Sequence, residues 1–356
     1  MRIAQIAPLF ESVPPRGYGG TERVVAYLTD ALQASKHEVT LFASGDSQTT
    51  AELCAGSPRA LRLDPQREDP IASHLVMIER AFERANDFDI IHAHLDYLTF
   101  PTARRCEVPV VTTLHGRLDL PWMPRVLAEF DEQRVISISK AQREQLPDAN
   151  WVGTVHHGLP HDLYQFHQVG SGGYLAFVGR ISIEKRVDRA IEIAVKSGVP
   201  LRIAAKVDPS DEAYFRTNIE PLLDNPLVEY VGELADEDKN DFIGNAKALV
   251  FPIDWPEPFG LAMIEALACG TPVIAWPHGS VPEIITDGVS GRIVPDVEAA
   301  ARAVGEIDDI DRRRCRAEFE TRFSAERMAR DYVKIYMKVL SGRGPRSRNP
   351  GARCIA

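Results

Sequence analysis

The chain is poor in cysteine and has no long apolar run. Its five cysteines are scattered over 356 residues without a Cys-x-x-Cys pair, so neither a disulfide framework nor a thiolate metal site is predicted. We therefore expect a reducing, cytoplasmic environment. No apolar stretch approaches the roughly 20 residues of a membrane-spanning helix. The opening MRIAQIAPLF is typical of a buried strand rather than a signal peptide, and we expect no integral membrane segment.

An excess of basic residues is also missing. The sequence has 41 lysines and arginines against 51 aspartates and glutamates, a formal net charge of −10. Because nucleic-acid binding requires a basic surface, this balance argues against a nucleic-acid partner but permits a small anionic ligand held by a few cations. The final residues SGRGPRSRNPGARCIA have little to bury, and we expect a disordered tail over 343–356.

Short apolar runs rich in β-branched residues alternate with helical periods along most of the chain. Strand-like runs occur at 3–7, 39–43, 90–93, 108–114 and 135–138. After a Gly- and Pro-containing linker they resume at 174–178, 201–205, 228–231, 248–251 and 273–275. This alternation predicts an α/β fold of two doubly wound, Rossmann-like domains facing across a cleft. Such sheets bind ligands beyond the carboxyl ends of their strands, so the cleft is expected to hold two substrates.

The segment FPIDWPEPFGLAMIEALACGTPVIA, residues 251–275, is the most informative. After a strand, a proline-rich turn carries Glu257, and a helix is predicted to begin near Phe259–Gly260 and to end at Gly270. Glu265 lies among apolar neighbours in this helix and therefore needs hydrogen-bond donors. The first amides of the helix, at residues 259–261, can bind an anion. Spacing alone is equally compatible with a capped helix whose glutamate bonds a neighbouring backbone group.

A second segment, YLAFVGRISIEKRVDRAIEIAV, places two cations after a strand. Arg180 and Lys185 lie between the strand, expected to end at Val178–Gly179, and a helix from about Val187. Two cations beside a helix amino terminus suit a diphosphate, and the segment matches neither a Walker loop nor GxGxxG. The alternative is a pair of solvated loop charges, with Glu184 pairing Lys185.

Histidines follow two of the predicted strands. The strand at 108–114 delivers His115 to its carboxyl end, where an imidazole can bond a ligand hydroxyl, although a lone histidine there is more often structural. His92 and His94 lie two apart on a strand and are expected to point the same way. No third ligand has suitable spacing, so no metal site is predicted. The run Asp236–Glu237–Asp238 is expected to be an acidic helix start.

Together, PEPFGLAMIEALACGTPVIA, the VGR…EK loop and the amino-terminal YGGTE resemble a large family of retaining glycosyltransferases. This family is typified by sucrose, glycogen and phosphatidylinositol mannosyl synthases and has the GT-B fold. The resemblance extends from Met1 to about Leu340. It implies transfer of a hexose from a nucleotide-diphosphate sugar, with UDP-glucose as the first donor to consider, to a hydroxyl acceptor. It also implies that no divalent ion or other cofactor is required.

The resemblance also implies roles for individual residues. Glu265 would bind the ribose, and Glu257 with the helix-start amides would hold the sugar hydroxyls and phosphate. Arg180 and Lys185 would neutralise the diphosphate, and His115 would contact the sugar near its C6 hydroxyl from the opposite domain. The stretch 231–234 would meet the base. The expected donor-binding set is Gly17, Gly19, Gly20, Gly179, Val231, Glu233, Leu234, Phe259, Gly260, Leu261 and Glu265, with His115, Arg180, Lys185 and Glu257 as catalytic residues.

The same resemblance implies a role for the glycine-rich stretch PPRGYGGTERVV. Its glycines would let the backbone approach the donor diphosphate from the first domain, while Arg16 and Tyr18 reach the acceptor side. A flexible turn is the plainer alternative. One departure is Arg186, because the family often has glycine after the lysine, and this puts the geometry of that turn in question.

Relatives in this family end with a helix that returns to the first domain. FSAERMARDYVKIYMKVL fits that helix, which divides the chain into 1–160 plus 324–342 and 161–323. The acceptor could be a small molecule, a saccharide or a lipid-linked group, and the protein a monomer or homodimer. Two alternatives remain at this point: a nucleotide-sugar epimerase of the same architecture, and a catalytically idle protein that binds sugar nucleotides.

Overall fold

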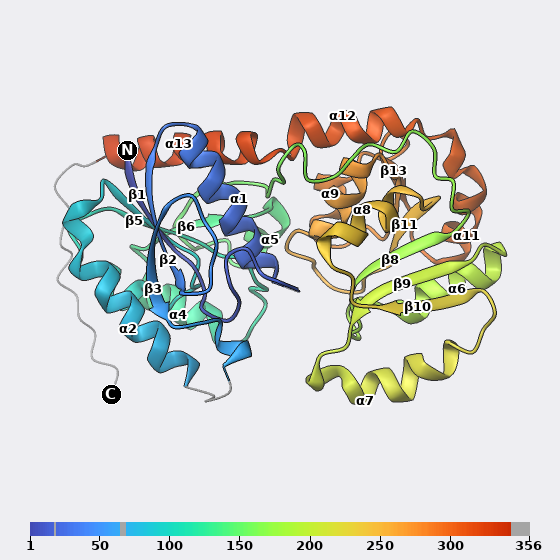
Figure 1. Cartoon of the computed structure of the whole chain (residues 1–356), viewed down its shortest axis with the longest axis horizontal. Coiled ribbons are helices and arrows are strands. Elements are labelled where there is room, and N and C mark those ends of the chain that lie inside the picture. The colour runs from blue at the N-terminus through green and yellow to red at the C-terminus, as the bar shows by residue number, and fades with distance from the viewer. Residues whose placement is uncertain (18, 65–68, 343–356) are drawn as a thin grey trace.

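A computed structural model describes residues 1–17, 19–64 and 69–342; Tyr18, residues 65–68 and the expected tail 343–356 lie outside the described residues. Over the described ranges, the chain forms two α/β units, each with a parallel β-sheet that carries helices on both faces (Figure 1). The first sheet has the order β3-β2-β1-β4-β5-β6-β7 and the second the order β10-β9-β8-β11-β12-β13. The predicted fold of two doubly wound α/β domains is confirmed.

In the first sheet, the interior strand β1 (Arg2–Ile6) pairs in parallel with β2 (Glu38–Ser44) and β4 (Ile90–Ala93). Ile3 and Ile6 of β1 are fully buried because both faces of the sheet are covered. The other strands of this sheet are β3 (Glu52–Ser57), β5 (Val110–Thr113), β6 (Arg134–Ser137) and β7 (Trp151–Thr154). The sequence did not predict β3 or β7, since these edge strands are only partly buried and carry no continuous apolar run.

The second sheet contains β8 (Leu175–Arg180), β9 (Leu201–Lys206), β10 (Val228–Gly232), β11 (Ala248–Phe251), β12 (Val273–Ala275) and β13 (Gly291–Ile293). The short edge strand β13 was not predicted from the sequence. Strand β8 also runs past its predicted end at Val178–Gly179, so that Arg180 is its last residue. Arg180 is paired there with Lys206, the last residue of β9, which brings two cations together at the carboxyl edge.

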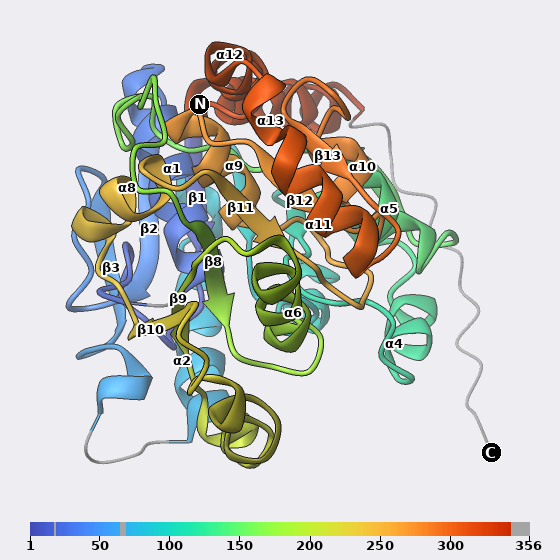
Figure 2. The same ribbon diagram turned by 90° about the vertical axis from the view of Figure 1, so that its right-hand side faces the viewer.

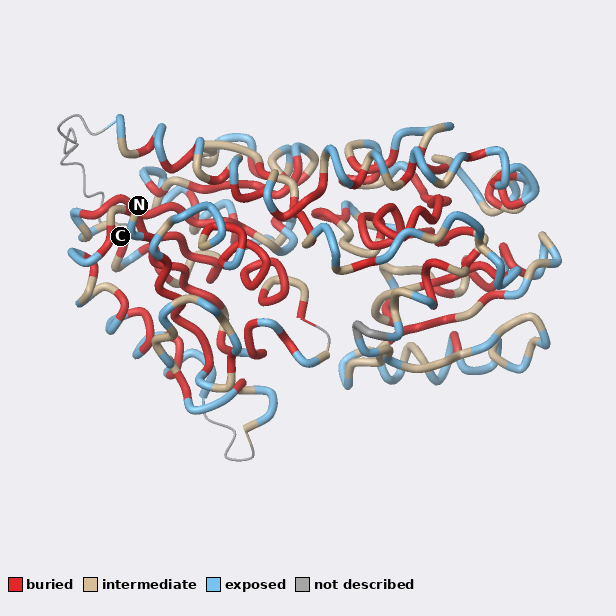
Figure 3. The backbone as a smooth tube through the Cα atoms, turned by 45° about the horizontal axis from the view of Figure 1, so that its top comes forward, coloured by how far each residue is buried: buried red, intermediate tan, exposed pale blue. Residues whose placement is uncertain are grey.

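Helices connect the strands and cover both sheets. On the second sheet, α6 and α11 lie against one face, and α8 and α9 against the other (Figure 2). Buried segments run through the strands of both sheets (Figure 3). Helix α8 begins at Asp236, as the acidic run predicts. The helices are α1 (Gly20–Ala34), α2 (Pro70–Glu83), α3 (Phe100–Ala103), α4 (Met123–Glu129), α5 (Lys140–Glu144), α6 (Val187–Ser197), α7 (Glu212–Tyr214), α8 (Asp236–Gly244), α9 (Leu261–Cys269), α10 (Val281–Ile284), α11 (Val297–Glu306), α12 (Arg312–Arg322) and α13 (Ala325–Ser341).

The last helix, α13, runs along the first domain beside α1, far in sequence from the strands that it covers (Figure 1). Its Tyr332 and Tyr336 are fully buried, and their hydroxyls bond Thr113 (3.1 Å) and His92 (2.7 Å) of the first sheet. We propose on this basis that the first domain comprises 1–160 with 324–342, and the second 161–323. The chain crosses between the domains at two adjacent places, joined by a β-bridge from Leu159 to Ser324.

The two crossings are packed so closely that Gly158 has no room for a side chain. A Cβ at this position would lie 2.2 Å from the carbonyl oxygen of Ser324. Gly158→Ala is therefore expected to lower the free energy of unfolding by about 1–3 kcal/mol, because the backbone must shift. Gly305→Ala is the matched control, since its Cβ would meet nothing within 4 Å in helix α11. That control should be neutral or stabilising by up to about 1 kcal/mol. Denaturant unfolding measures both, and equal effects would contradict the expectation.

Candidate active site

A cavity of about 590 Å³ lies where the carboxyl ends of strands from both sheets meet. This size suits a small-molecule ligand. Among the predicted site residues that the structure describes, only Val231 does not line the cavity; it lies in β10, packed against the core. The predicted residues that line the cavity are Gly17, Gly19, Gly20, His115, Gly179, Arg180, Lys185, Glu233, Leu234, Glu257, Phe259, Gly260, Leu261 and Glu265.

The glycine-rich loop approaches the second domain directly. A Cβ on Gly17 would lie 3.0 Å from Oε1 of Glu233, and one on Gly20 would lie 3.7 Å from Cδ1 of Leu261. Gly17 is also fixed by its carbonyl, which accepts a hydrogen bond from Arg23 (2.9 Å). Helix α1 begins at Gly20, so its first amides lie at this loop. The small residues thus allow the two domains to come close at this wall of the cavity.

The cationic end of the cavity contains Arg180 and Lys206, and the latter was not predicted. Two aspartates partly neutralise this pair. Arg180 lies 3.6 Å from Oδ2 of Asp208 and 3.4 Å from Oδ2 of Asp211, and Lys206 lies 3.1 Å from Oδ1 of Asp208. The signal for Lys206 was its place at the end of β9, but pairing it with Arg180 requires the strand register. The two cations concentrate positive charge locally on an otherwise acidic chain, which is a charge distribution suited to an anion.

Lys185 forms an ion pair with Glu257 at the cavity wall. The indole N–H of Trp255 donates to Oε2 of Glu257 (2.9 Å), and the Lys185 ammonium lies 5.2 Å from the Trp255 ring. Glu184 does not pair with Lys185 as the alternative reading of this loop suggested. It lies 3.8 Å from Arg117, which belongs to the first domain. The Lys185 ammonium therefore faces the cavity, held by a carboxylate and an aromatic ring.

Glu265 is buried in α9, with 4% of its surface exposed, and lies 3.8 Å from the ammonium of Lys239. A lysine of α8 thus supplies the partner that a buried carboxylate needs. Helix α9 begins at Leu261, directly after Gly260, whose φ of +81° is the left-handed conformation that favours glycine. The amides at the start of α9 face the same cavity as Glu265.

Arg186 adopts the left-handed backbone conformation that favours glycine, the residue that the family resemblance led us to expect at this position. Its φ is +54° and its ψ is +53°, so an arginine occupies the left-handed region before α6. The guanidinium bonds Asp188 (2.7 Å) and Asp254 (2.7 Å). These ion pairs offset the backbone strain, which is about 1–2 kcal/mol for a non-glycine residue. The loop that carries Lys185 is therefore formed without glycine.

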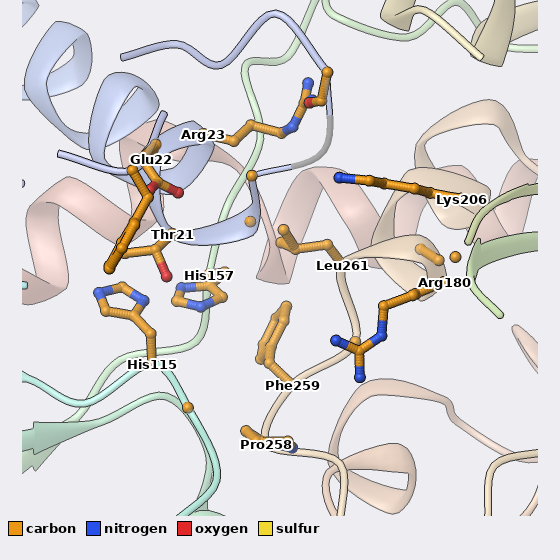
Figure 4. Close-up of a pocket in the computed structure, with 18 of the residues that line it drawn as sticks. Thr21, Glu22, Arg23, His115, His157, Arg180, Lys206, Pro258, Phe259 and Leu261 are labelled. Carbon is orange, nitrogen blue, oxygen red and sulfur yellow. The ribbon is translucent and has the colours of Figure 1, made fainter. Parts of the chain in front are cut away.

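A wall of imidazoles closes the other end of the cavity (Figure 4). The rings of His115 and His157 are stacked, with centroids 5.3 Å apart and planes at 15°. Burial lowers the pKa of His115 to about 3 and that of His157 well below its usual value, so both rings are neutral. Sequence reasoning missed His157. The pair His156–His157, which begins two residues after the end of β7, was a signal, but the strand itself had not been predicted.

The imidazole of His115 is the exposed end of a buried hydrogen-bond network. Its Nε2 lies 2.8 Å from Nδ1 of His94, whose Nε2 lies 2.7 Å from Oε1 of Gln5. Gln5 donates to the hydroxyl of Tyr336 (3.4 Å), which in turn bonds His92 (2.7 Å). His92 and His94 do lie side by side, with ring centroids 4.0 Å apart. In the described part of the chain, no group of three or more His, Cys, Asp or Glu side chains is placed to hold a metal ion.

Glu283 joins the two domains beside this wall. Its carboxylate accepts hydrogen bonds from the amides of Lys140 (2.9 Å) and Ala141 (2.8 Å) in the first domain and contacts His156 (3.1 Å). Burial raises the pKa of Glu283, but the hydrogen bonds from His156 and the two amides outweigh it and lower the pKa overall. The contact sets the relative position of the domains, and nothing in the sequence pattern indicated it.

Comparison with known proteins assigns this arrangement to a family. Residues 167–322 match the model of the glycosyl transferases group 1, and residues 18–163 match that of glycosyltransferase family 4. The chain belongs to the group 1 glycosyltransferases, and it has their GT-B fold. Over the described residues, no helix combines the length and the apolar character needed to cross a membrane.

Individual relatives agree with this assignment over nearly the whole chain. Glycogen synthase from Mycobacterium tuberculosis is 24% identical over 399 residues, which cover 95% of both chains. The structure of sucrose-phosphate synthase from Thermosynechococcus elongatus matches with a TM-score of 0.78 and 20% identity, covering 96% of this chain and 99% of that one. Anabaena HepE, solved in complex with UDP and glucose, matches with a TM-score of 0.72 and 17% identity, covering 95% and 100%.

Proposed function

We propose that this glycosyltransferase moves a hexosyl group from a nucleoside-diphosphate sugar to a hydroxyl acceptor, with retention of anomeric configuration. The observation that carries the proposal is the division of one cavity into two chemical ends. Arg180 and Lys206 supply positive charge at one end, the neutral His115 lies at the other (Figure 4), and Lys185 adds a further cation to the lining. UDP-glucose is the first donor to test, because the structurally similar HepE binds UDP and glucose.

The donor would span the cavity from its cationic end to the imidazoles. Its diphosphate would meet Arg180, Lys206 and the first amides of α9, and Lys185 would exchange part of its contact with Glu257 for phosphate. Glu265, already buried beside Lys239, would accept hydrogen bonds from the ribose hydroxyls. Glu257 and His115 would then bind hydroxyls of the sugar.

In the reaction, the bond between the anomeric carbon and the diphosphate oxygen breaks, and negative charge develops on the leaving phosphate. The cations and helix-start amides stabilise that charge because they are already in position. The acceptor oxygen bonds the anomeric carbon from the face of the leaving group. The acceptor proton passes to the leaving phosphate oxygen, and we assign no protein residue as base. Closure of the domains excludes water from the sugar cation.

The decisive experiment is a donor screen. Purified protein is titrated with UDP-, GDP- and ADP-sugars, and binding is followed by thermal shift and nucleotide release. A transferase should release free nucleoside diphosphate only when an acceptor hydroxyl is present, apart from slow hydrolysis. An epimerase would instead return a changed sugar nucleotide, and an idle binding protein would show stabilisation without turnover. Family membership favours transfer over these two alternatives.

Transfer is expected to continue after divalent ions are removed. The positive charge that stabilises the diphosphate would come from Arg180, Lys185 and Lys206, which the chain itself supplies. Activity measured with excess EDTA should therefore remain within about twofold of the untreated value, a change of under about 0.5 kcal/mol in barrier. A strict requirement for added Mg²⁺ or Mn²⁺ would overturn this part of the proposal.

A further inference from the structure

Arg117 of the first domain reaches the second domain without lining the cavity. It lies in the loop between β5 and α4. Its Nη1 lies 3.8 Å from Oε1 of Glu184, and its Cζ lies 5.7 Å from the centre of the Trp255 ring. Glu184 directly precedes Lys185, and Trp255 lines the cavity. The reaction described above gives this arginine no role.

The loop that carries Arg117 is anchored within its own domain. The side-chain amide of Gln142, which is fully buried, donates to the carbonyl oxygens of Leu114 (2.9 Å) and Gly116 (2.9 Å). Asp119 accepts two hydrogen bonds from Arg117, one from Nε (2.8 Å) and one from Nη2 (2.8 Å). Because such a bidentate pair fixes the plane of the guanidinium, Nη1 is held on the side of the second domain.

The two second-domain residues at this contact both support Lys185. The indole N–H of Trp255 donates to Oε2 of Glu257 (2.9 Å), which pairs with the Lys185 ammonium. The same ammonium lies 5.2 Å from the Trp255 ring. The carbonyl oxygen of Glu184 accepts a hydrogen bond from the amide of Asp254 (2.9 Å), which joins the Lys185 loop to the turn before Glu257. The contact therefore involves both segments that position the Lys185 ammonium.

We propose that Arg117 is a positioning residue for sugar transfer, which holds the loop of Lys185 against the first domain while the donor is bound. The inference rests on the proposed function, because it takes Lys185 to bind the diphosphate. Lys185 would exchange part of its contact with Glu257 for phosphate, whereas Arg117 lies outside the cavity lining and keeps its contacts. Since Arg117 lies two residues after His115, it also fixes the diphosphate end of the site relative to the sugar end.

Arg117→Met tests the proposal because it keeps an unbranched apolar side chain and removes the guanidinium. With a sugar nucleotide that the wild type uses, kcat for nucleotide release is expected to fall about 10-fold. The Kd of UDP should change by less than about twofold, because UDP is bound by residues of the second domain. Arg117→Lys, which keeps the charge without the planar fork, should recover part of kcat. Arg105→Met is the matched control, since that exposed first-domain arginine bonds the carbonyl oxygen of Pro101 (2.6 Å).

A double-mutant cycle separates positioning from a general loss of structure. Glu184→Gln removes the charge that faces Arg117, so adding Arg117→Met to it should lower kcat only about threefold further. If Arg117→Met does not fold, Arg117→Gln takes its place in the cycle. Unchanged kcat in the single variant, or an equal loss in both backgrounds, would overturn the role of Arg117 while the proposed function stands. If the wild type transfers no sugar from any donor, the proposed function fails, and the assignment of Arg117 fails with it.

Discussion

Replacing Lys185 by alanine is expected to slow sugar transfer by about 10²- to 10³-fold, which corresponds to about 3–4 kcal/mol of transition-state stabilisation. The ammonium lies at the cavity wall, held by Glu257 and by the ring of Trp255. In the reaction it would oppose charge that develops only as the diphosphate departs. The loss should therefore appear in kcat more than in KM, as measured by steady-state nucleotide release.

Stability should change much less than activity in this variant. Glu257 retains the indole N–H of Trp255 at 2.9 Å and borders the cavity, so its carboxylate is not left isolated in the core. We expect a fall in Tm of less than about 5 °C. Lys196→Ala is the matched control, because that lysine lies on helix α6 with its side chain 41% exposed. Unchanged turnover of Lys185→Ala would exclude a role for Lys185 in binding phosphate. If Lys185→Ala does not fold, Lys185→Gln, which keeps a polar side chain of similar length, is used to measure the loss of turnover in a folded variant.

Acidification below pH 6.5 is expected to destabilise the protein steeply. Burial, reinforced by neighbouring imidazoles, lowers the pKa of His92, His94 and His157 well below the usual value, and burial alone lowers that of His115 to about 3. As pH falls below about 6.5, the unfolded chain binds protons on these histidines while the folded chain, whose histidine pKa values are lowered, does not, so stability falls as pH falls. Each histidine contributes about 1.4 kcal/mol per pH unit, and four contribute on the order of 5.

Carboxyl groups whose pKa is raised by burial oppose this trend: Asp96, Glu22, Asp30 and Asp211. Burial raises the pKa of Asp96 to about 6, so the folded protein takes up this proton before the unfolded chain does. Between about pH 6 and pH 4, acidification therefore favours folding through this group by up to about 1.4 kcal/mol per pH unit. Because the unfolded imidazoles are only partly protonated in this range, the free energy of unfolding should fall by about 4 kcal/mol in total between pH 7.0 and 5.5, measured by urea unfolding at pH 7.0, 6.0 and 5.5. His157→Gln should reduce this fall, and His161→Gln should not. A constant free energy of unfolding over this range would contradict the expectation.

The sequence indicated the fold because its central strands carry their own signal. The run at 90–93 is fully buried in β4, and its β-branched residues are typical of a strand covered on both faces. The edge strands β3 and β7 gave no such signal, because partial burial permits glycine and polar residues. Helix α9 could be delimited because Gly270 ends it in a left-handed conformation.

The candidate site was predictable where its residues share a segment. Glu257 and Glu265 lie eight positions apart in one turn and helix, and Arg180 and Lys185 share one loop. Lys206 and His157 were missed because they reach the cavity only through the register of β9 against β8 and through the path of the connecting segment. Local periodicity contains no information about such alignments, which depend on how the strands pair and the domains pack.

The position of helix α13 sets the order in which the protein can fold during synthesis. Strands β1 to β7 emerge from the ribosome first, but the buried hydroxyls of Tyr332 and Tyr336 that pack on this sheet belong to the last described helix. The second sheet and its covering helices are complete once residue 322 has emerged. One face of the first sheet therefore stays uncovered until α13 has been synthesised. The second domain, although translated later, is expected to complete its hydrophobic core before the first domain does.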